Sequence, residues 1–129
     1  MLSQTHWETA VYAEDTWSYF VGTTPPPDSW NQLSFDANSW NTGPGGFGYA
    51  DGDDNTVIVN TLSVFFRKTF NVSSLEEILS LAIHADYDDG FVIYINGIEI
   101  LRSENMGDPG SQVTYQQTTD TDHEAVMYQ

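Results

Sequence analysis

The stretch that decides the fold class is FVIYINGIEIL, residues 91–101. Two apolar runs rich in β-branched residues, FVIYI and IEIL, flank the dipeptide Asn96-Gly97. A two-residue hairpin turn needs a positive φ at both central positions, which Asn and Gly tolerate better than other residues. The stretch therefore predicts two antiparallel β-strands joined by a tight turn.

The same β character extends upstream. The run Thr56–Phe70 is rich in β-branched and aromatic residues, and both of its faces are partly apolar, so we expect a strand near the centre of a sheet. Ile78–Ala85 is apolar enough for a further strand, and Trp7–Tyr12 and Trp17–Val21 are candidates for short strands. No segment shows a sustained 3.6-residue period. The chain is therefore predicted to be a single all-β domain over residues 1–129, built as a β-sandwich.

Turn-forming residues separate these runs. Thr23–Asp28 is expected to be stiff and extended, and the glycine-rich Asn41–Gly48 and the Asn105–Gly110 stretch are predicted as loops. Leu75–Leu79 has room for one helical turn, which Ser73 or Ser74 would cap.

Charge is the most unusual feature of the composition. The 129 residues include 19 Asp and Glu but only 3 Lys and Arg, for a formal net charge of −16, and there is no Cys. Three basic residues cannot neutralise a phosphate backbone, so nucleic acid is a poor partner, and anionic membrane surfaces are disfavoured for the same reason. No apolar run reaches the length of a membrane span, and Met1–Ala10 lacks the features of a signal peptide. We therefore expect either an intracellular protein or a segment of a longer secreted chain.

Clustered carboxylates suggest a site for calcium. Asp51, Asp53 and Asn55 imitate the first ligand positions of a helix-loop-helix calcium loop, but Thr56 stands where that motif needs Gly and Leu62 where it needs Glu. A looser calcium site formed by Asp51, Asp53 and Asp54 remains one interpretation. The other is an exposed acidic turn whose side chains bind backbone N–H groups.

A second acidic turn, Asp86–Gly90, places three carboxylates between two predicted strands. A cation, Arg67 or Arg102, or the backbone donors of the turn would have to compensate their repulsion. Paired carboxylates also occur in glycosidases, but neighbouring residues of one turn cannot straddle a sugar ring, so we do not expect catalysis. His123, between Asp122 and Glu124, is the one histidine flanked by carboxylates and is a weak candidate for a transition-metal ligand.

Aromatic residues near the predicted loops suit carbohydrate. Sugar rings stack on aromatic faces while carboxylates and amides bind their hydroxyls. The candidate ligand-binding residues are Trp30, Trp40, Tyr49, Tyr87, Asp88, Asp89 and Asn96. The alternative is that Trp30 and Trp40 fill the ends of the sandwich, since an aromatic side chain buries a large area.

Residues 30–125 resemble the galactose-binding-like jelly-roll modules of large secreted bacterial multidomain proteins. The resemblance is carried by Trp30, Phe35-Asp36, Ser39-Trp40, Gly46-Phe47-Gly48-Tyr49, Asp51-Gly52-Asp53-Asp54, Phe65–Phe70, Ala85–Ile100, Arg102 and Asn105-Met106. It implies a secreted, cell-surface or extracellular β-sandwich without catalytic activity, which binds a glycan or cell-surface polysaccharide. In that pattern Asp36 and Trp40 have a structural character.

Two further expectations follow from the resemblance. Such modules continue with another apolar strand beyond a segment like Asp122–Ala125, whereas this sequence ends at Gln129. A jelly roll without its last strands would leave an open sheet edge for a partner chain, a second fragment or a swapped copy to fill. The alternative function is therefore a structural or adhesion module that contacts other proteins or spaces domains, and a hydrolase fragment is the least favoured.

Overall fold

The predicted hairpin is confirmed. The computed structural model describes residues 6–49, 52 and 54–125, and in it β6 (Val92–Ile95) pairs antiparallel with β7 (Ile98–Arg102). Asn96 and Gly97 have φ values of 49° and 82°, as the turn requires. Asn-Gly has therefore set the register of this pair, which shifts once at a bulge between Ile93 and Tyr94.

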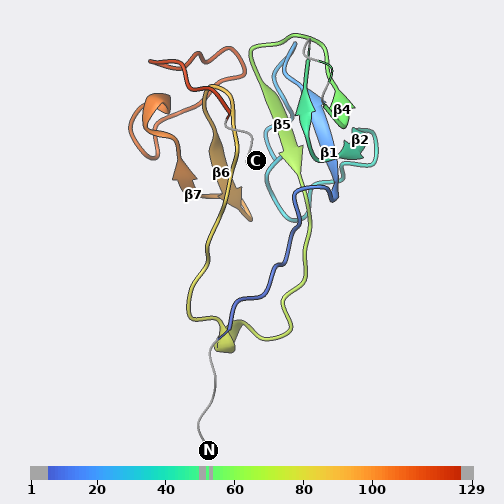
Figure 1. Cartoon of the computed structure of the whole chain (residues 1–129), viewed down its shortest axis with the longest axis vertical. Coiled ribbons are helices and arrows are strands. Elements are labelled where there is room, and N and C mark those ends of the chain that lie inside the picture. Colours follow the sequence, from blue (N-terminus) through green and yellow to red (C-terminus); the bar gives the residue numbers. More distant parts are fainter. Residues whose placement is uncertain (1–5, 50–51, 53, 126–129) are drawn as a thin grey trace, which may run out of the picture.

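A second sheet has three antiparallel strands in the order β2-β1-β5 (Figure 1). They are β1 (Thr16–Val21), β2 (Asn41–Pro44) and β5 (Val64–Arg67). The expected strand at Trp17–Val21 is thus confirmed, and it occupies the centre of the sheet. The chain is mostly β, built from small sheets, and its described residues contain neither a closed barrel nor an α-helix.

Two predictions about this region were wrong. Asn41–Gly48 is not a loop, because it contributes β2 and the two-residue strand β3 (Phe47–Gly48), which pairs in parallel with β4 (Thr56–Val57). Its glycines serve close packing, since a Cβ at Gly45 would collide with the backbone of Ala13. Thr56–Phe70 is not one central strand but contributes β4 and the edge strand β5.

The strands expected at Trp7–Tyr12 and Ile78–Ala85 are absent from the described structure. Both runs have the residue composition of a strand. A β-strand, however, forms only when its backbone groups hydrogen-bond to a neighbouring strand, and neither run is paired in this way. The helical turn expected at Leu75–Leu79 is confirmed as η1 (Leu75–Glu77), although the Ser74 side chain makes no capping bond. A further 3₁₀ turn, η2 (Glu104–Met106), overlaps the start of the predicted Asn105–Gly110 loop.

The two faces of the β1–β5 pair carry different aromatic clusters. Tyr19 and Phe66 both contact Phe47, with ring centroids 5.4 and 4.6 Å apart respectively. On the opposite face Phe20 and Phe65 lie 6.3 Å apart. This alternation is what a pleated strand imposes on successive residues, and it agrees with the expectation that both faces of this run are partly apolar.

Trp30 joins the two sheets. Its ring meets Phe65 of β5 edge-on at 5.1 Å and Tyr94 of β6 at 5.7 Å. The indole thus bridges the three-stranded sheet and the hairpin, which are adjacent in Figure 1. Burial of the Tyr94 ring raises the pKa of its phenol, as expected where an aromatic side chain leaves water.

Arg67 holds the loop that carries Trp30. Its guanidinium donates hydrogen bonds to the carbonyls of Trp30, Gln32 and Phe35, at 2.5, 2.9 and 3.4 Å. The same group lies 5.2 Å from the centre of the Phe35 ring, in a cation–π contact. One side chain at the end of β5 therefore fixes the segment that packs between the sheets, which we call the Trp30 loop (residues 28–38).

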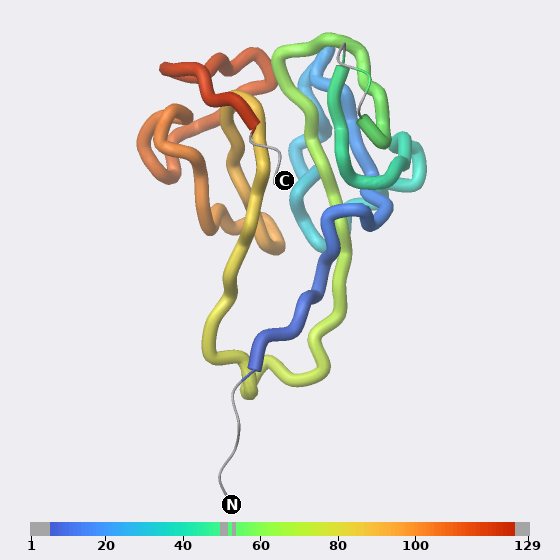
Figure 2. The backbone as a smooth tube through the Cα atoms, in the orientation of Figure 1, coloured from blue at the N-terminus to red at the C-terminus, as the bar shows by residue number. Residues whose placement is uncertain are grey.

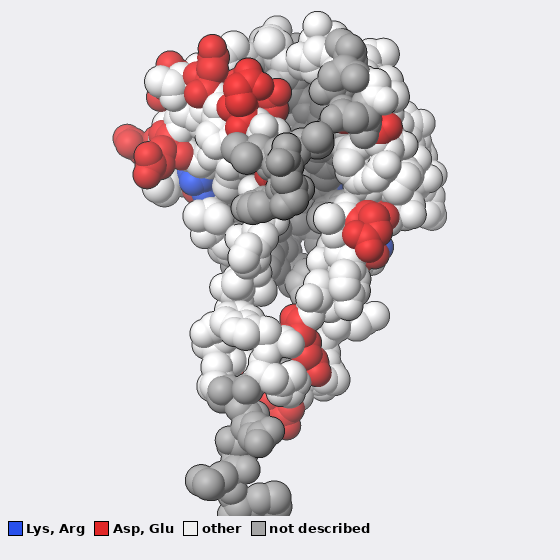
Figure 3. Space-filling model, in the orientation of Figure 1, with Lys and Arg blue, Asp and Glu red and all other residues white. Residues whose placement is uncertain are grey.

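The other end of the molecule is a long arm. Figure 2 shows residues 70–90 running away from the sheets to η1 and back, and residues 6–12 reach the same end. The arm exposes large apolar side chains, among them Trp7 (72% exposed) and Leu79 (78%). Figure 3 shows acidic side chains scattered over the visible face with little basic surface. The arm therefore exposes both apolar and acidic side chains, and its residues 6–12 and 70–85 belong to no strand pair of the described structure.

Candidate functional site

The two tryptophans predicted to stack on sugars pack against other aromatic side chains. Trp40 is 9% exposed, and its ring packs on Phe20 at 5.3 Å and Phe35 at 5.5 Å. Trp30 is half-buried between the two sheets, as described above. Both rings thus have packing contacts of the kind that the alternative interpretation expects, while the filling of sandwich ends stays a prediction.

The acidic turn Asp86–Gly90 is tied down by the end of the chain. The Tyr87 ring stacks on the His123 ring at 4.0 Å, and the backbone N–H of His123 donates to Asp89 Oδ1 at 3.1 Å. Asn105 Nδ2 donates to the carbonyl of Asp89 at 2.6 Å. The Asp89 carboxylate thus accepts a backbone N–H from outside the turn, which is not one of the compensations expected from the sequence, while Asp88 is exposed.

The His123 ring has a defined hydrogen-bonding role in this arrangement. Its Nδ1 lies 2.9 Å from the carbonyl of Tyr87, and a carbonyl only accepts, so Nδ1 carries a proton. The described residues include no group of three or more His, Asp or Glu placed to hold a metal ion. His123 is therefore accounted for by its contacts with the acidic turn.

The remaining predicted site residues do not gather with these. Tyr49 is 46% exposed, and Asn96 is exposed at the tip of the β6–β7 turn. Asp54 is half-buried against Gly48, whereas Asp51 and Asp53 lie outside the described residues. Calcium binding by these three carboxylates stays a prediction from the sequence.

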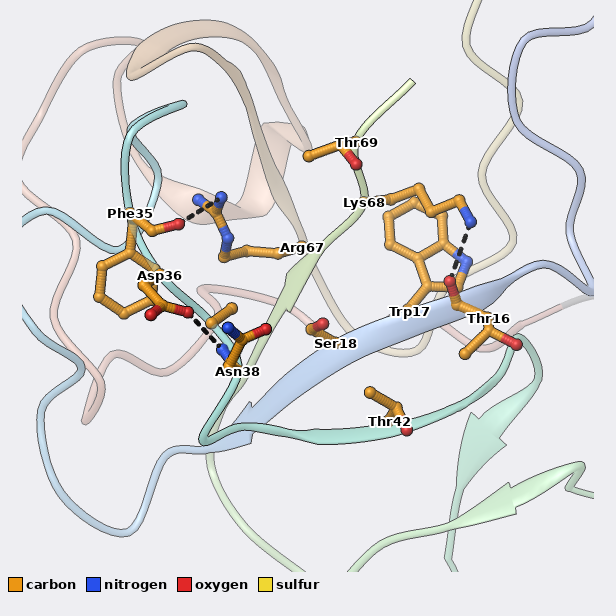
Figure 4. Close-up of a pocket in the computed structure, with 11 residues that line it drawn as sticks. Thr16, Trp17, Ser18, Phe35, Asp36, Asn38, Thr42, Arg67, Lys68 and Thr69 are labelled. Carbon is orange, nitrogen blue, oxygen red and sulfur yellow. Dashed lines mark hydrogen bonds between the residues drawn. The ribbon is translucent and has the colours of Figure 1, made fainter. Parts of the chain in front are cut away.

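A shallow depression of about 370 Å³ lies where β1, the Trp30 loop and the end of β5 meet (Figure 4). Most of its wall is polar. The residues lining it are Thr16, Trp17, Ser18, Phe35, Asp36, Ala37, Asn38, Thr42, Arg67, Lys68 and Thr69. Its volume is at the lower end of the range for ligand pockets, about 300–1,000 Å³. We call it the Trp17 depression.

Local hydrogen bonds shape one wall of the Trp17 depression. Asp36 Oδ1 accepts the backbone N–H of Asn38 at 2.9 Å, and the N–H of Trp40 donates to the carbonyl of Ala37 at 2.9 Å. These two bonds fold residues 36–40 into a tight turn of the Asx type. Together with Arg67, they fix the position of the Asp36 and Asn38 side chains beside β1 (Figure 4).

Trp17 differs from Trp30 and Trp40 in having no ring partner. Its side chain is half-buried, and it takes part in none of the aromatic contacts found in the described part of the chain. Sequence reasoning placed Trp17 only in a strand and so missed it as a site residue. The carboxylate, amide, ammonium and hydroxyl groups around Trp17 come from distant parts of the sequence. The pairing of β1 with β5 brings them together, so the sequence alone does not show them as neighbours.

Arg102 forms a second polar cluster, and its role is structural. It is 8% exposed, and it donates to both carboxylate oxygens of Glu99, to the carbonyl of Met106 and to Ser111. Gly110 N–H also donates to Glu99 Oε2 at 2.8 Å. The pair therefore fastens the loop after β7 to the hairpin.

The comparisons give no relative from which to carry a role over: none of the protein-family models, curated proteins or solved structures matches this chain. Within the part of the chain that the structure describes, no helix is long and apolar enough to cross a membrane.

The Glu99–Arg102 pair predicts a pH dependence of stability. The hydrogen bonds from Arg102 lower the pKa of Glu99 below its usual 4.5, so the pair stabilises the folded state above that pH. This stabilisation is lost as the pH falls through the lowered pKa of the folded state. We expect the thermal midpoint of the native protein to fall further between pH 6 and pH 3 than that of Glu99→Gln.

The comparison with Glu99→Gln is needed because protonation of the other carboxylates also changes the net charge. A matched variant, Glu104→Gln, removes an exposed carboxylate next to the same loop. Thermal unfolding followed by circular dichroism measures all three proteins. Equal pH dependence in native protein and Glu99→Gln would contradict a stabilising pair.

Proposed function

We propose that this chain is a non-catalytic, extracellular carbohydrate-binding module with the jelly-roll sandwich of galactose-binding-like modules. The observation that carries the proposal is the Trp17 depression, where an indole without a ring partner stands among polar side chains. A sugar offers an apolar C–H face and a set of hydroxyls. A concave site with aromatic and directed polar groups is suited to both.

Some groups of the depression suit the apolar C–H face of a sugar, and others suit its hydroxyls. Trp17 supplies an aromatic face, and Phe35 adds apolar surface beside it. Asp36 accepts hydrogen bonds, Asn38 donates and accepts them, and the hydroxyls of Thr16, Ser18, Thr42 and Thr69 do both. This set supports binding of one or two sugar rings in preference to a long glycan.

The carboxylate content of the site supports a non-catalytic module. Asp36 is the one carboxylate among the lining residues, and it accepts the Asn38 N–H. Glycoside hydrolysis ordinarily needs two carboxyl groups, about 5–9.5 Å apart, on either side of the scissile bond. The lining residues thus offer groups that bind a sugar but no second carboxyl group for hydrolysis.

Replacing Trp17 tests the proposal. We expect Trp17→Ala to weaken binding of a β-1,4-galactotriose probe roughly tenfold in isothermal titration calorimetry, because an aromatic packing partner worth about 1.5 kcal/mol is removed. Trp7→Ala is the matched control, since Trp7 is exposed and lies outside the depression. Asn38→Ala, an exposed change, gives a second measure if Trp17→Ala lowers stability.

The proposal fails if the native protein does not bind neutral or acidic oligosaccharides. It also fails if Trp17→Ala and Trp7→Ala lose affinity equally.

A second candidate function, a module that contacts another polypeptide, is favoured by the apolar arm. Residues 6–14 and 70–90 contain no Lys or Arg but include Glu8, Glu14, Glu76 and Glu77. A second copy of a chain with net charge −16 would be repelled, so charge complementarity selects a basic partner. We propose an extended, basic, β-prone segment that pairs with Ile78–Ala85 by strand addition.

Two peptides of opposite charge test this candidate. We expect an octapeptide of alternating Lys and Val to bind the native protein, and one of alternating Glu and Val not to bind. The double variant Leu79→Ser with Leu81→Ser leaves the net charge unchanged while removing exposed apolar contacts, so it should weaken binding at least fivefold. Unchanged binding would mean non-specific charge attraction, and dimers in sedimentation velocity would mean that a second copy covers the arm; either result overturns the candidate.

A further inference from the structure

The few basic residues of this chain are distributed unevenly. Of the 3 Lys and Arg, Arg102 is paired with Glu99, and the other two, Arg67 and Lys68, both line the Trp17 depression. The ion pairs of the described residues are His6–Glu8 and Arg102–Glu99. In a chain with 19 Asp and Glu, two cations without a carboxylate partner in the described structure therefore share one depression.

Neutral oxygens solvate both of these charges. Lys68 Nζ donates to the carbonyl of Thr16 at 3.0 Å, and an ammonium group has three donors, so two are left for other acceptors. Arg67 donates to the loop carbonyls already described. Carbonyl dipoles stabilise a cation, but they do not cancel its charge.

The depression is consequently electropositive within an acidic protein. Its ionisable lining residues are Arg67, Lys68 and Asp36, and Figure 4 shows the two cations leaving the chain in different directions, Arg67 towards Phe35 and Lys68 towards Thr16. At physiological ionic strength the screening length is about 8 Å, so carboxylates elsewhere on the protein act weakly at this site. The local charge governs which ligand is accepted.

We infer that the Trp17 depression takes a sugar that carries a negative charge, such as a uronic acid, with Lys68 as the group that pairs with the ligand carboxylate. The inference rests on the proposed function and specifies its ligand class. Trp17 provides the face for the ring, and the Asp36 and Asn38 wall receives the hydroxyls on the side away from Lys68 (Figure 4).

A matched pair of ligands isolates the charge. Trigalacturonic acid and its methyl ester share rings and ring hydroxyls, but only the acid is anionic at pH 7. In calorimetry at about 0.15 M salt, where charge screening is physiological, we expect the native protein to bind the acid about fivefold more tightly than the ester. Such a ratio corresponds to about 1 kcal/mol, the upper range for an accessible ion pair.

Variants at Lys68 assign the preference to one side chain. Lys68→Gln should bind acid and ester equally, and Lys68→Arg should keep the preference because the charge remains. Gln116→Glu lowers the net charge by the same amount at an exposed position outside the depression, and it should leave the ratio unchanged.

Each result has one meaning. Equal binding of acid and ester by the native protein, or a preference that survives in Lys68→Gln, overturns the inference. If the ester still binds in a manner that depends on Trp17, the proposed function stands while its acidic ligand does not. If neither ligand binds, the proposed function fails as well.

Discussion

The contact between Arg67 and the Trp30 loop is the interaction on which the rest of the structure depends. A guanidinium presents its donors in a flat, fixed fork, and here that fork meets three carbonyls of one loop. The loop carries Trp30, which bridges β5 and β6, and Phe35, which packs on Trp40. Without Arg67 these carbonyls would lose a charged donor in the loop that carries the aromatic bridge between the sheets.

The same constraint creates the candidate site. Arg67 holds the Trp30 loop at the end of β5, so that Asp36 and Asn38 line one side of the depression and Trp17 and Lys68 line the other (Figure 4). Because its partners are carbonyls, its charge is not neutralised by a described carboxylate. Arg67 therefore stabilises the loop and also lines the proposed sugar site, in which we assign the pairing with a ligand carboxylate to Lys68.

The parts of the fold that could be predicted from sequence are those with local causes. The β6–β7 turn followed from Asn96-Gly97, whose allowed φ values are a property of the residues themselves. Non-local pairing decided the rest. Gly43 and Gly45 are typical loop residues in the sequence, but in the fold they allow the close approach of Thr56 and Ala13. Ile78–Ala85 has the composition of a strand, but no neighbouring strand pairs with it.

The candidate site was harder to predict than the fold, because closeness to a turn in the sequence does not determine whether an aromatic side chain packs inside the fold. Trp30 and Trp40 lie near loops but pack against other aromatic rings, whereas Trp17 lies in β1 and lines the depression. A signal was nevertheless present in the sequence. Arg67 and Lys68 are adjacent in a chain with only 3 basic residues, and both line the depression that we propose as the site.

The free energy of unfolding of Arg67→Lys in urea tests the central role of Arg67 most directly. A lysine keeps the charge but cannot reach three carbonyls at once. The account predicts a loss of roughly 2–3 kcal/mol, since hydrogen bonds from a charged donor are worth about 1.5–3 kcal/mol and their carbonyls are left unpaired. A loss below about 0.5 kcal/mol, the size of an ordinary surface change, would contradict it.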